Sequence, residues 1–117
     1  MNQKKITDTR INAVTQKVLK AAQDTLGDSL DRVILFGSYA RGDFNVESDI
    51  DFLIIAHVSQ EEASASRRQI RKRLPGIDLE YDLVVCLHVT GSETFNRFQN
   101  VLPFYQNVLR EGVLVND

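Results

Sequence analysis

The fold of this 117-residue chain is decided by the stretch Gly37-Ser38-Tyr39-Ala40-Arg41-Gly42-Asp43 and the nearby run Asp49-Ile50-Asp51-Phe52-Leu53-Ile54-Ile55. The first stretch follows residues 33–36, a short apolar run typical of a buried strand. Gly37 therefore lies where the backbone leaves the sheet, and glycine allows a positive φ angle and close approach of a ligand. Ser38 can cap a short helical turn, which would direct free N–H groups at an anion such as phosphate.

Two carboxylates open the second stretch. Asp49 and Asp51 are two residues apart at the start of a predicted strand over residues 49–56, so both side chains share one face. Such a pair repels unless a cation lies between the two groups, and oxygen ligands on a rigid strand suit Mg²⁺. The alternative is that Asp49 is a turn residue and Asp51 a solvated position. If this strand is antiparallel to residues 33–36, the glycine turn and the carboxylates meet at one edge.

The combined pattern resembles a known family signature. It consists of Gly37-Ser38, ten intervening residues, and then Asp49-Ile50-Asp51 between apolar residues. This is similar to the signature of the DNA polymerase β-like nucleotidyltransferase superfamily, and in particular of its minimal nucleotidyltransferase (MNT) branch. The resemblance covers most of the chain. It implies an α/β (α+β) fold, in which helices pack against a small mixed sheet of about three to four strands.

That family also requires a third carboxylate on a later strand. A strand predicted over residues 77–86 offers Asp78, Glu80 and Asp82, which would alternate onto one face. Asp82 is preferred because an apolar run follows it, much as one follows Asp51. Glu80 is the reserve, which would assist or replace Asp82. The alternative is that these acids form only the polar face of a half-buried strand.

The resemblance implies a catalytic and metal-binding set of three carboxylates, Asp49, Asp51 and Asp82. Transfer of a nucleotidyl group requires stabilisation of negative charge on the attacking and the leaving oxygens, which two Mg²⁺ ions roughly 3.5 to 4 Å apart accomplish. Asp49 and Asp51 would bridge the two ions. Asp82 would bind the catalytic ion and could accept the proton of the attacking hydroxyl.

The nucleotide-binding set is Gly37, Ser38 and Arg41. The backbone at Gly37 and the Ser38 hydroxyl would hold the β and γ phosphates. Arg41 either neutralises triphosphate charge or anchors the loop, and the sequence leaves both roles open. No residue is seen to read the base, so ATP as the substrate is what the resemblance implies.

The acceptor also follows only from the resemblance. MNT proteins are commonly paired with a HEPN-domain partner, often as the antitoxin of a toxin–antitoxin pair, and some modify a partner tyrosine with AMP. The chain is therefore expected to transfer AMP to a hydroxyl of a HEPN-type toxin. Two alternatives stay open: transfer to a small-molecule hydroxyl such as that of an aminoglycoside, and a non-catalytic antitoxin that masks its partner.

Composition agrees with one ordinary domain over residues 1–117. Hydrophobic residues make up 43% of the chain, the formal net charge is -2, and no apolar run approaches membrane-spanning length. No secretory signal pattern opens the sequence. One cysteine, Cys86, cannot form an internal disulfide, which favours a reducing cytoplasm. Cys86 lies in an apolar run and is interpreted as a small core residue.

Further elements are predicted around the motif. Apolar residues at helical spacing indicate a helix over residues 6–26. Ser59 and Glu62 have the spacing of a capping box that opens a helix toward residue 74. A crossover of this length makes the strands before and after it parallel. One surface of that helix is basic, which is typical of a solvated face and does not favour direct nucleic-acid binding: Arg67, Arg68, Arg71, Lys72 and Arg73.

The C-terminal segment is rich in aromatic residues. Residues 95–109 predict either one helix broken near Pro103 or two short helices, and residues 113–115 a further edge strand. The aromatic side chains are interpreted mainly as core, although their number leaves room for a homo-oligomer or partner surface.

Overall fold

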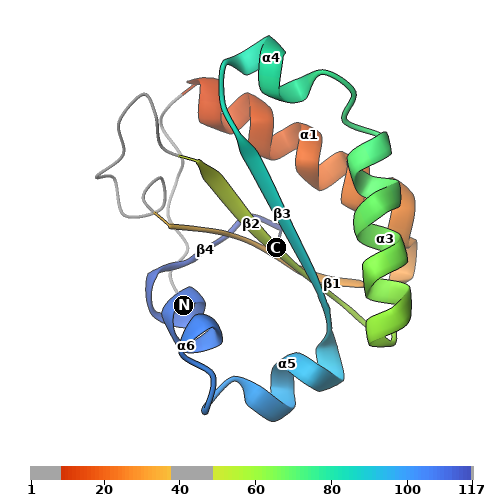
Figure 1. Ribbon diagram of the computed structural model, residues 1–117, viewed down its shortest axis with the longest axis vertical. Helices are drawn as coiled ribbons and strands as arrows, with labels where there is room; N and C mark the ends of the chain where they lie inside the picture. Colours follow the sequence, from red (N-terminus) through yellow and green to blue (C-terminus); the bar gives the residue numbers. More distant parts are fainter. Residues whose placement is uncertain (1–8, 38–48, 117) are drawn as a thin grey trace.

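The computed structural model describes residues 9–37 and 49–116, and at its centre is a four-stranded mixed sheet in the order β3-β2-β1-β4 (Figure 1). Strand β1 is antiparallel to both β2 and β4, whereas β2 is parallel to β3. This confirms the mixed sheet expected from the sequence. The strands are β1 Leu30–Phe36, β2 Ile50–Ala56, β3 Val85–Gly91 and β4 Val113–Leu114.

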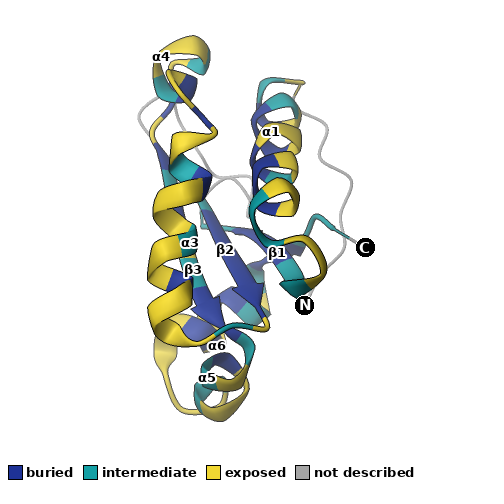
Figure 2. Cartoon of the chain, turned by 90° about the vertical axis from the view of Figure 1, so that its right-hand side faces the viewer, coloured by how far each residue is buried: buried dark blue, intermediate teal, exposed yellow. Residues whose placement is uncertain are grey.

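Helices cover both faces of this sheet. On one face lie α1, α3 and α4, and on the other lie α5 and α6, while the 3₁₀ turn η1 links α1 to β1 (Figures 1 and 2). None of the described helices is long and apolar enough to cross a membrane. The helical elements are α1 Thr9–Leu26, η1 Gly27–Ser29, α3 Gln60–Lys72, α4 Ile77–Tyr81, α5 Ser92–Phe98 and α6 Pro103–Glu111.

The two helical layers bury two separate apolar cores, because β2 alternates its side chains between them. Phe52 and Ile54 pack into the first core with α1, α3 and α4. Leu53 and Ile55 pack into the second with α5 and α6. Figure 2 shows the resulting pattern, with a buried central sheet and exposed outer faces on α1 and α3. Asp51 follows the same alternation, which places it on the side of the second core.

The crossover helix α3 begins as predicted. The Ser59 hydroxyl accepts a 3.1 Å hydrogen bond from the Glu62 backbone N–H, and the Glu62 carboxylate accepts a 3.2 Å bond from the Ser59 N–H. Two of its basic residues turn toward the edge strand β3. Arg67 Nε donates to the Leu87 carbonyl at 2.8 Å, and Arg71 donates to the Val85 carbonyl. These bonds occupy part of the free edge of β3, which limits pairing with another strand.

The strand predicted over residues 77–86 is wrong in its first half. Residues 77–81 form the short helix α4, and β3 begins only at Val85. Asp82 closes the helix in a left-handed conformation with φ 53°, and its N–H donates to the Asp78 carbonyl. The sequence pattern predicted a strand because Ile77, Leu79 and Leu83 are spaced as on the buried face of a strand. Ile77 and Leu83 are indeed buried, whereas Leu79 is 90% exposed.

A buried threonine in α1 provides a test of the first core. The Thr15 side chain is 1% exposed, and its hydroxyl has no hydrogen-bond partner within the described part of the chain. Thr15→Val replaces this hydroxyl with a methyl group of similar size. We expect the free energy of unfolding to rise by about 1 kcal/mol, because an unsatisfied buried hydroxyl is removed. Urea unfolding monitored by circular dichroism measures the change.

Thr90→Val is the matched control, since Thr90 is 4% exposed. Its hydroxyl is bonded to the Tyr105 hydroxyl at 3.1 Å and to the Gln60 side-chain oxygen at 3.3 Å. The same substitution here should lower the free energy of unfolding by about 1 to 2 kcal/mol. Equal effects at the two positions would contradict this account of the Thr15 site.

Candidate active site

The glycine turn and the second aspartate meet at one edge of the sheet. Phe36, the last residue of β1, pairs with Asp51 in the antiparallel register, and Gly37 follows it with φ +83°. A Cβ atom built on Gly37 would lie 2.7 Å from Asp51 Oδ2. Glycine is therefore required at this position for two reasons: the positive φ angle, and the lack of space for a Cβ atom beside the carboxylate. The predicted meeting of turn and carboxylate is confirmed for Gly37 and Asp51.

The sulfur of Cys86 lies beside both carboxylates. In the parallel register between β2 and β3, Asp51 pairs with Cys86. Cys86 Sγ donates to Asp49 Oδ2 at 3.8 Å and also to the Asp51 carboxylate. Burial raises the pKa of the Cys86 thiol above its ordinary value, and the charges of Asp51 and Asp49 raise it further. The sulfur is therefore a protonated thiol at neutral pH.

Asp51 is the more enclosed of the two acids. It is half-buried, whereas Asp49 is exposed. Burial raises the pKa of the Asp51 carboxyl, and the charge of Asp49 acts in the same direction, while His88 and the hydrogen bond from Cys86 oppose the rise. Burial removes the water that would screen the repulsion between the two carboxylates. A cation between them would offset this repulsion.

An aromatic cluster lies next to the carboxylates on the same face of the sheet. The ring of His88 is 5.7 Å from that of Phe36 and 5.5 Å from that of Phe104. Burial lowers the pKa of His88, with Asp51 opposing and Arg67 adding to the effect, so the imidazole is uncharged at pH 7. Phe104 remains 41% exposed. The cluster thus offers apolar ring surface close to Asp51.

An open hollow of about 760 Å³ runs along β3 and contains this cluster. Its lining combines Cys86 at the carboxylate end, His88 and Phe104 on one side, and Arg67 and Arg71 on the other. Such a hollow is large enough for a nucleotide or for an aromatic side chain of a partner. It brings together ring surface and positive charge, and Cys86 links it to the neighbouring carboxylates of Asp49 and Asp51.

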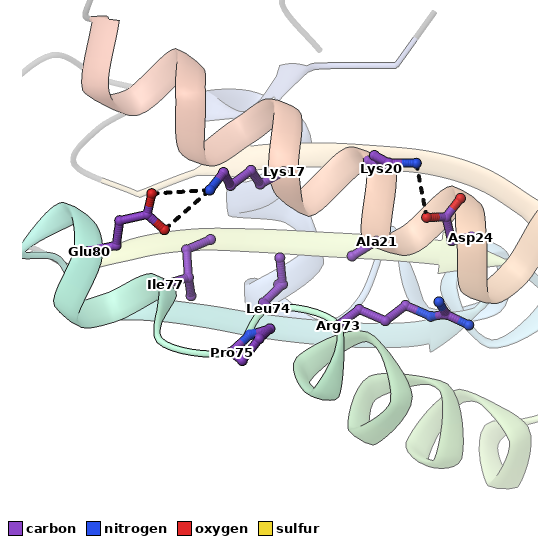
Figure 3. A pocket seen from close by; sticks show the side chains of 9 residues that line it. All are labelled: Lys17, Lys20, Ala21, Asp24, Arg73, Leu74, Pro75, Ile77 and Glu80. Carbon is purple, nitrogen blue, oxygen red and sulfur yellow. Dashed lines mark hydrogen bonds and ion pairs between the residues drawn. The ribbon is translucent and has the colours of Figure 1, made fainter.

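A second hollow, of about 320 Å³, lies between α1 and the segment joining α3 to α4 (Figure 3). Figure 3 shows two ion pairs in its lining, with Lys17 Nζ 3.2 Å from Glu80 Oε1 and Lys20 Nζ 3.2 Å from Asp24 Oδ2. The third cation, Arg73, donates from Nε to the Thr25 hydroxyl at 3.0 Å. Its apolar floor belongs to the first core. This hollow therefore lies on the opposite face of the sheet from Cys86 and His88.

Comparison with known proteins identifies the family. A family model described as a nucleotidyltransferase domain matches residues 15–114. The chain belongs to this nucleotidyltransferase family. It is a nucleotidyltransferase enzyme by that membership, as the resemblance implied.

Two relatives of this nucleotidyltransferase come from one organism. A protein of Methanocaldococcus jannaschii named as a candidate protein adenylyltransferase is 34% identical over 112 residues, which cover 96% of both chains. Another such protein from that organism is 40% identical over 72 residues, covering 62% of this chain and 71% of the relative.

Two solved structures share the fold. One is a toxin–antitoxin complex with AMP-PNP, with TM-score 0.58 and 22% identity, covering 86% of this chain and 70% of that one. The other is described as a candidate minimal nucleotidyltransferase, with TM-score 0.58 and 20% identity, covering 90% of this chain and 92% of that one.

The structure corrects the predicted position of the third carboxylate in this nucleotidyltransferase. Asp82 was expected on a strand beside Asp51, but it lies at the end of α4, before β3 begins. Glu80, the reserve, points toward Lys17 on α1 (Figure 3). Asp78 binds the Val85 N–H at 3.2 Å. None of the three therefore joins the pair formed by Asp49 and Asp51, because the segment that carries them is helical.

Ser38 and Arg41, the two other predicted nucleotide-binding residues, lie outside the described residues. Their expected roles stay predictions. Gly37 is described, and its φ angle and contact with Asp51 agree with the place of the glycine in the motif.

The donor set fits a divalent cation only in part. Asp49 and Asp51 provide the hard oxygen ligands that Mg²⁺ prefers. The neighbouring position on β3 holds the thiol of Cys86, a soft donor that suits other metals. Within residues 9–37 and 49–116, no three His, Cys, Asp or Glu side chains are arranged to hold a metal ion. The expectation of three protein carboxylates around two Mg²⁺ ions therefore does not fit the described residues.

Sequence reasoning missed the neighbourhood of Cys86 and His88. Cys86 was interpreted as a core residue of an apolar run, and no functional role was assigned to His88. The register of that strand against β2 decides which residue faces Asp51. If the strand is started at Val85 rather than near residue 77, Cys86 aligns with Asp51. The β-branched residues of the run 84–90 favour a strand that begins there. The alternating acids at 78, 80 and 82 led to a predicted strand that began earlier.

Gly37→Ala tests the contact between the turn and the carboxylate. The substitution places a methyl group against Asp51 Oδ2 and forces alanine into a left-handed backbone conformation. We expect a loss of about 2 to 3 kcal/mol in the free energy of unfolding and at least about a tenfold loss of nucleotidyl transfer. Urea unfolding and a transfer assay measure the two effects.

Gly76→Ala is the control for backbone conformation. Gly76 has φ +71°, but no heavy atom lies within 4 Å of its added Cβ. This substitution should lower the free energy of unfolding by about 1 to 2 kcal/mol, through the backbone conformation alone, and leave nucleotidyl transfer unchanged. If both variants lose transfer equally, the contact with Asp51 is not what makes Gly37 necessary.

Proposed function

We propose that this nucleotidyltransferase transfers AMP from ATP to a hydroxyl, a tyrosine hydroxyl in particular, on a HEPN-type toxin, and thereby acts as its antitoxin. The observation that carries the proposal is the contact of Gly37 with the carboxylate of Asp51, with Asp49 two residues before it. This arrangement joins a glycine turn suited to phosphate with a carboxylate pair suited to a divalent cation.

The reaction makes clear demands on the site. The acceptor oxygen bonds to the α-phosphorus of ATP, the bond from that phosphorus to the bridging oxygen breaks, and pyrophosphate leaves while the hydroxyl loses its proton. Divalent cations, Mg²⁺ in this proposal, would stabilise the charge on the entering and leaving oxygens. Asp49 and Asp51 would hold them, and a carboxylate within hydrogen-bond reach can accept the proton. Gly37, Ser38 and Arg41 keep their proposed roles toward the phosphates.

A protein acceptor is supported by three findings. The relative that matches 96% of this chain is named as a candidate protein adenylyltransferase. The structural neighbour with AMP-PNP is a toxin–antitoxin complex. The ring surface of Phe36, His88 and Phe104 also lies beside Asp51, where the aromatic ring of a tyrosine can stack. The proposal includes a single domain over residues 1–117 that functions in the cytoplasm.

Labelled ATP tests the transfer. The chain is incubated with a HEPN-domain protein that co-purifies with it, using ATP labelled on the α-phosphate in one reaction and on the γ-phosphate in another. Nucleotidyl transfer predicts that only the α-label reaches the partner and that peptide mapping locates it on a tyrosine. Transfer of the γ-label, or an unlabelled partner, contradicts the proposal.

The alternatives predict different results. Transfer to a small molecule predicts turnover on a purified aminoglycoside with no protein present. Masking of the toxin predicts that Asp51→Ala retains full neutralising activity. The carboxylate pair beside Gly37 argues against masking alone, because a binding surface has no need of two adjacent carboxylates with one half-buried.

A further inference from the structure

Cys86 occupies the position where a third ligand would complete the carboxylate site. It pairs with Asp51 across the parallel strands β2 and β3. Its sulfur lies 3.8 Å from Asp49 Oδ2. Neighbouring strands are about 4.8 Å apart, so aligned side chains on one face are in contact. A carboxylate at position 86 would therefore face the other two.

The acids near β3 are committed elsewhere. Glu80 forms an ion pair with Lys17 at 3.2 Å on the opposite face of the sheet. Asp78 lies 3.6 Å from Arg71 and accepts a bond from the Val85 N–H. Asp82 has helix-ending backbone geometry and is exposed. In the part of the chain that the structure describes, no third carboxylate accompanies Asp49 and Asp51.

We infer that residue 86 is the third position of this metal site, and that its thiol, in place of a carboxylate, keeps the free protein from binding Mg²⁺ tightly. Mg²⁺ is a hard cation that takes oxygen ligands and does not favour sulfur. A thiol in place of a carboxylate removes one oxygen ligand and one negative charge. In the wild type, the phosphates of the nucleotide must then supply the missing oxygen ligands. The inference rests on the proposed function for its site, but not on the identity of the acceptor.

Isothermal titration calorimetry with MgCl₂ and the nucleotide-free protein tests the inference. Cys86→Asp should bind Mg²⁺ at least about tenfold more tightly than the wild type, because ligand charge and number set the affinity of such sites. Cys86→Ala is the matched control. It removes the sulfur, adds neither an oxygen ligand nor a charge, and should bind Mg²⁺ within about twofold of the wild type. Asp82→Asn should leave Mg²⁺ binding unchanged.

A thermal measurement covers the case in which three carboxylates weaken the fold. Without Mg²⁺, Cys86→Asp should unfold at a lower temperature than the wild type, since the added charge repels Asp49 and Asp51. Addition of Mg²⁺ should raise its midpoint by more than it raises that of the wild type. Cys86→Asn adds an amide oxygen without charge, so it should also tighten Mg²⁺ binding, by a smaller factor than Cys86→Asp.

Two results would overturn the inference. One is Mg²⁺ binding by Cys86→Asp and Cys86→Asn that is no tighter than that of Cys86→Ala. The other is weaker Mg²⁺ binding by Asp82→Asn, which would make Asp82 the third ligand. Both readouts are independent of transfer. If Cys86→Asp binds Mg²⁺ tightly but the partner stays unlabelled, only the proposed acceptor is contradicted. If the partner is labelled but Cys86→Asp binds Mg²⁺ no more tightly than the wild type, only this inference is contradicted.

Discussion

Asp51→Asn is expected to reduce nucleotidyl transfer by about a thousandfold or more while the protein stays folded. Asparagine keeps the size of the side chain but removes the charge that holds a cation at the end of β2. The loss of one preorganised electrostatic group in an active site commonly has an effect of about this size. Asp51 pairs with Phe36 and approaches Gly37, which places its carboxylate at the glycine turn.

Initial rates of label transfer from ATP to the partner measure this effect. Circular dichroism and urea unfolding establish that the Asp51→Asn variant is folded. Asp82→Asn is the matched control, since Asp82 lies at the end of α4 and not beside Asp51. It should retain transfer within about twofold of the wild type. A large loss in Asp82→Asn with little loss in Asp51→Asn would mean that the site lies elsewhere.

Phe95→Ala should lower the free energy of unfolding by about 3 to 5 kcal/mol, the largest effect on stability expected here. Phe95 is 0% exposed and belongs to the second core with Leu53 and Ile55. Its ring lies 4.9 Å from that of Tyr105 on α6. The substitution leaves a cavity where α5, α6 and the sheet meet, and the surrounding backbone can close it only in part.

Phe104→Ala removes a ring of the same size from a 41% exposed position. We expect the free energy of unfolding to fall by about 1 kcal/mol, because the substitution removes the ring contacts with Phe36 and His88 but little buried area. Urea unfolding of both variants gives the comparison. Equal losses at the two positions would contradict the assignment of Phe95 to a closed second core.

Much of the fold and part of the site could be predicted because they depend on local pattern. The capping box at Ser59, the crossover that makes β2 and β3 parallel, and the break at Pro103 were each confirmed. The meeting of Gly37 and Asp51 followed from the antiparallel pairing of two strands that are consecutive in the sequence. In each case residues close in sequence, or one connection length, decide the outcome.

The position opposite Asp51 on β3 could not be predicted in this way. It depends on the register of a strand that reaches the sheet after a long crossover, and a shift in that register replaces one residue facing Asp51 with another. The alternation of Asp78, Glu80 and Asp82 fitted a strand, but α4 formed because Ile77 packs into the first core and Asp82 closes the turn in a left-handed conformation. Cys86 therefore took the place expected for a carboxylate.

The most direct test of the central claim is the intact mass of the partner. A HEPN-domain protein that co-purifies with the chain is incubated with ATP and Mg²⁺ and either the wild type or the Asp49→Ala, Asp51→Ala double variant. We predict that the partner gains the mass of one or more AMP units with the wild type and none with the double variant. A partner whose mass is unchanged by the folded wild type, or equally increased by both proteins, would contradict nucleotidyl transfer at this carboxylate pair.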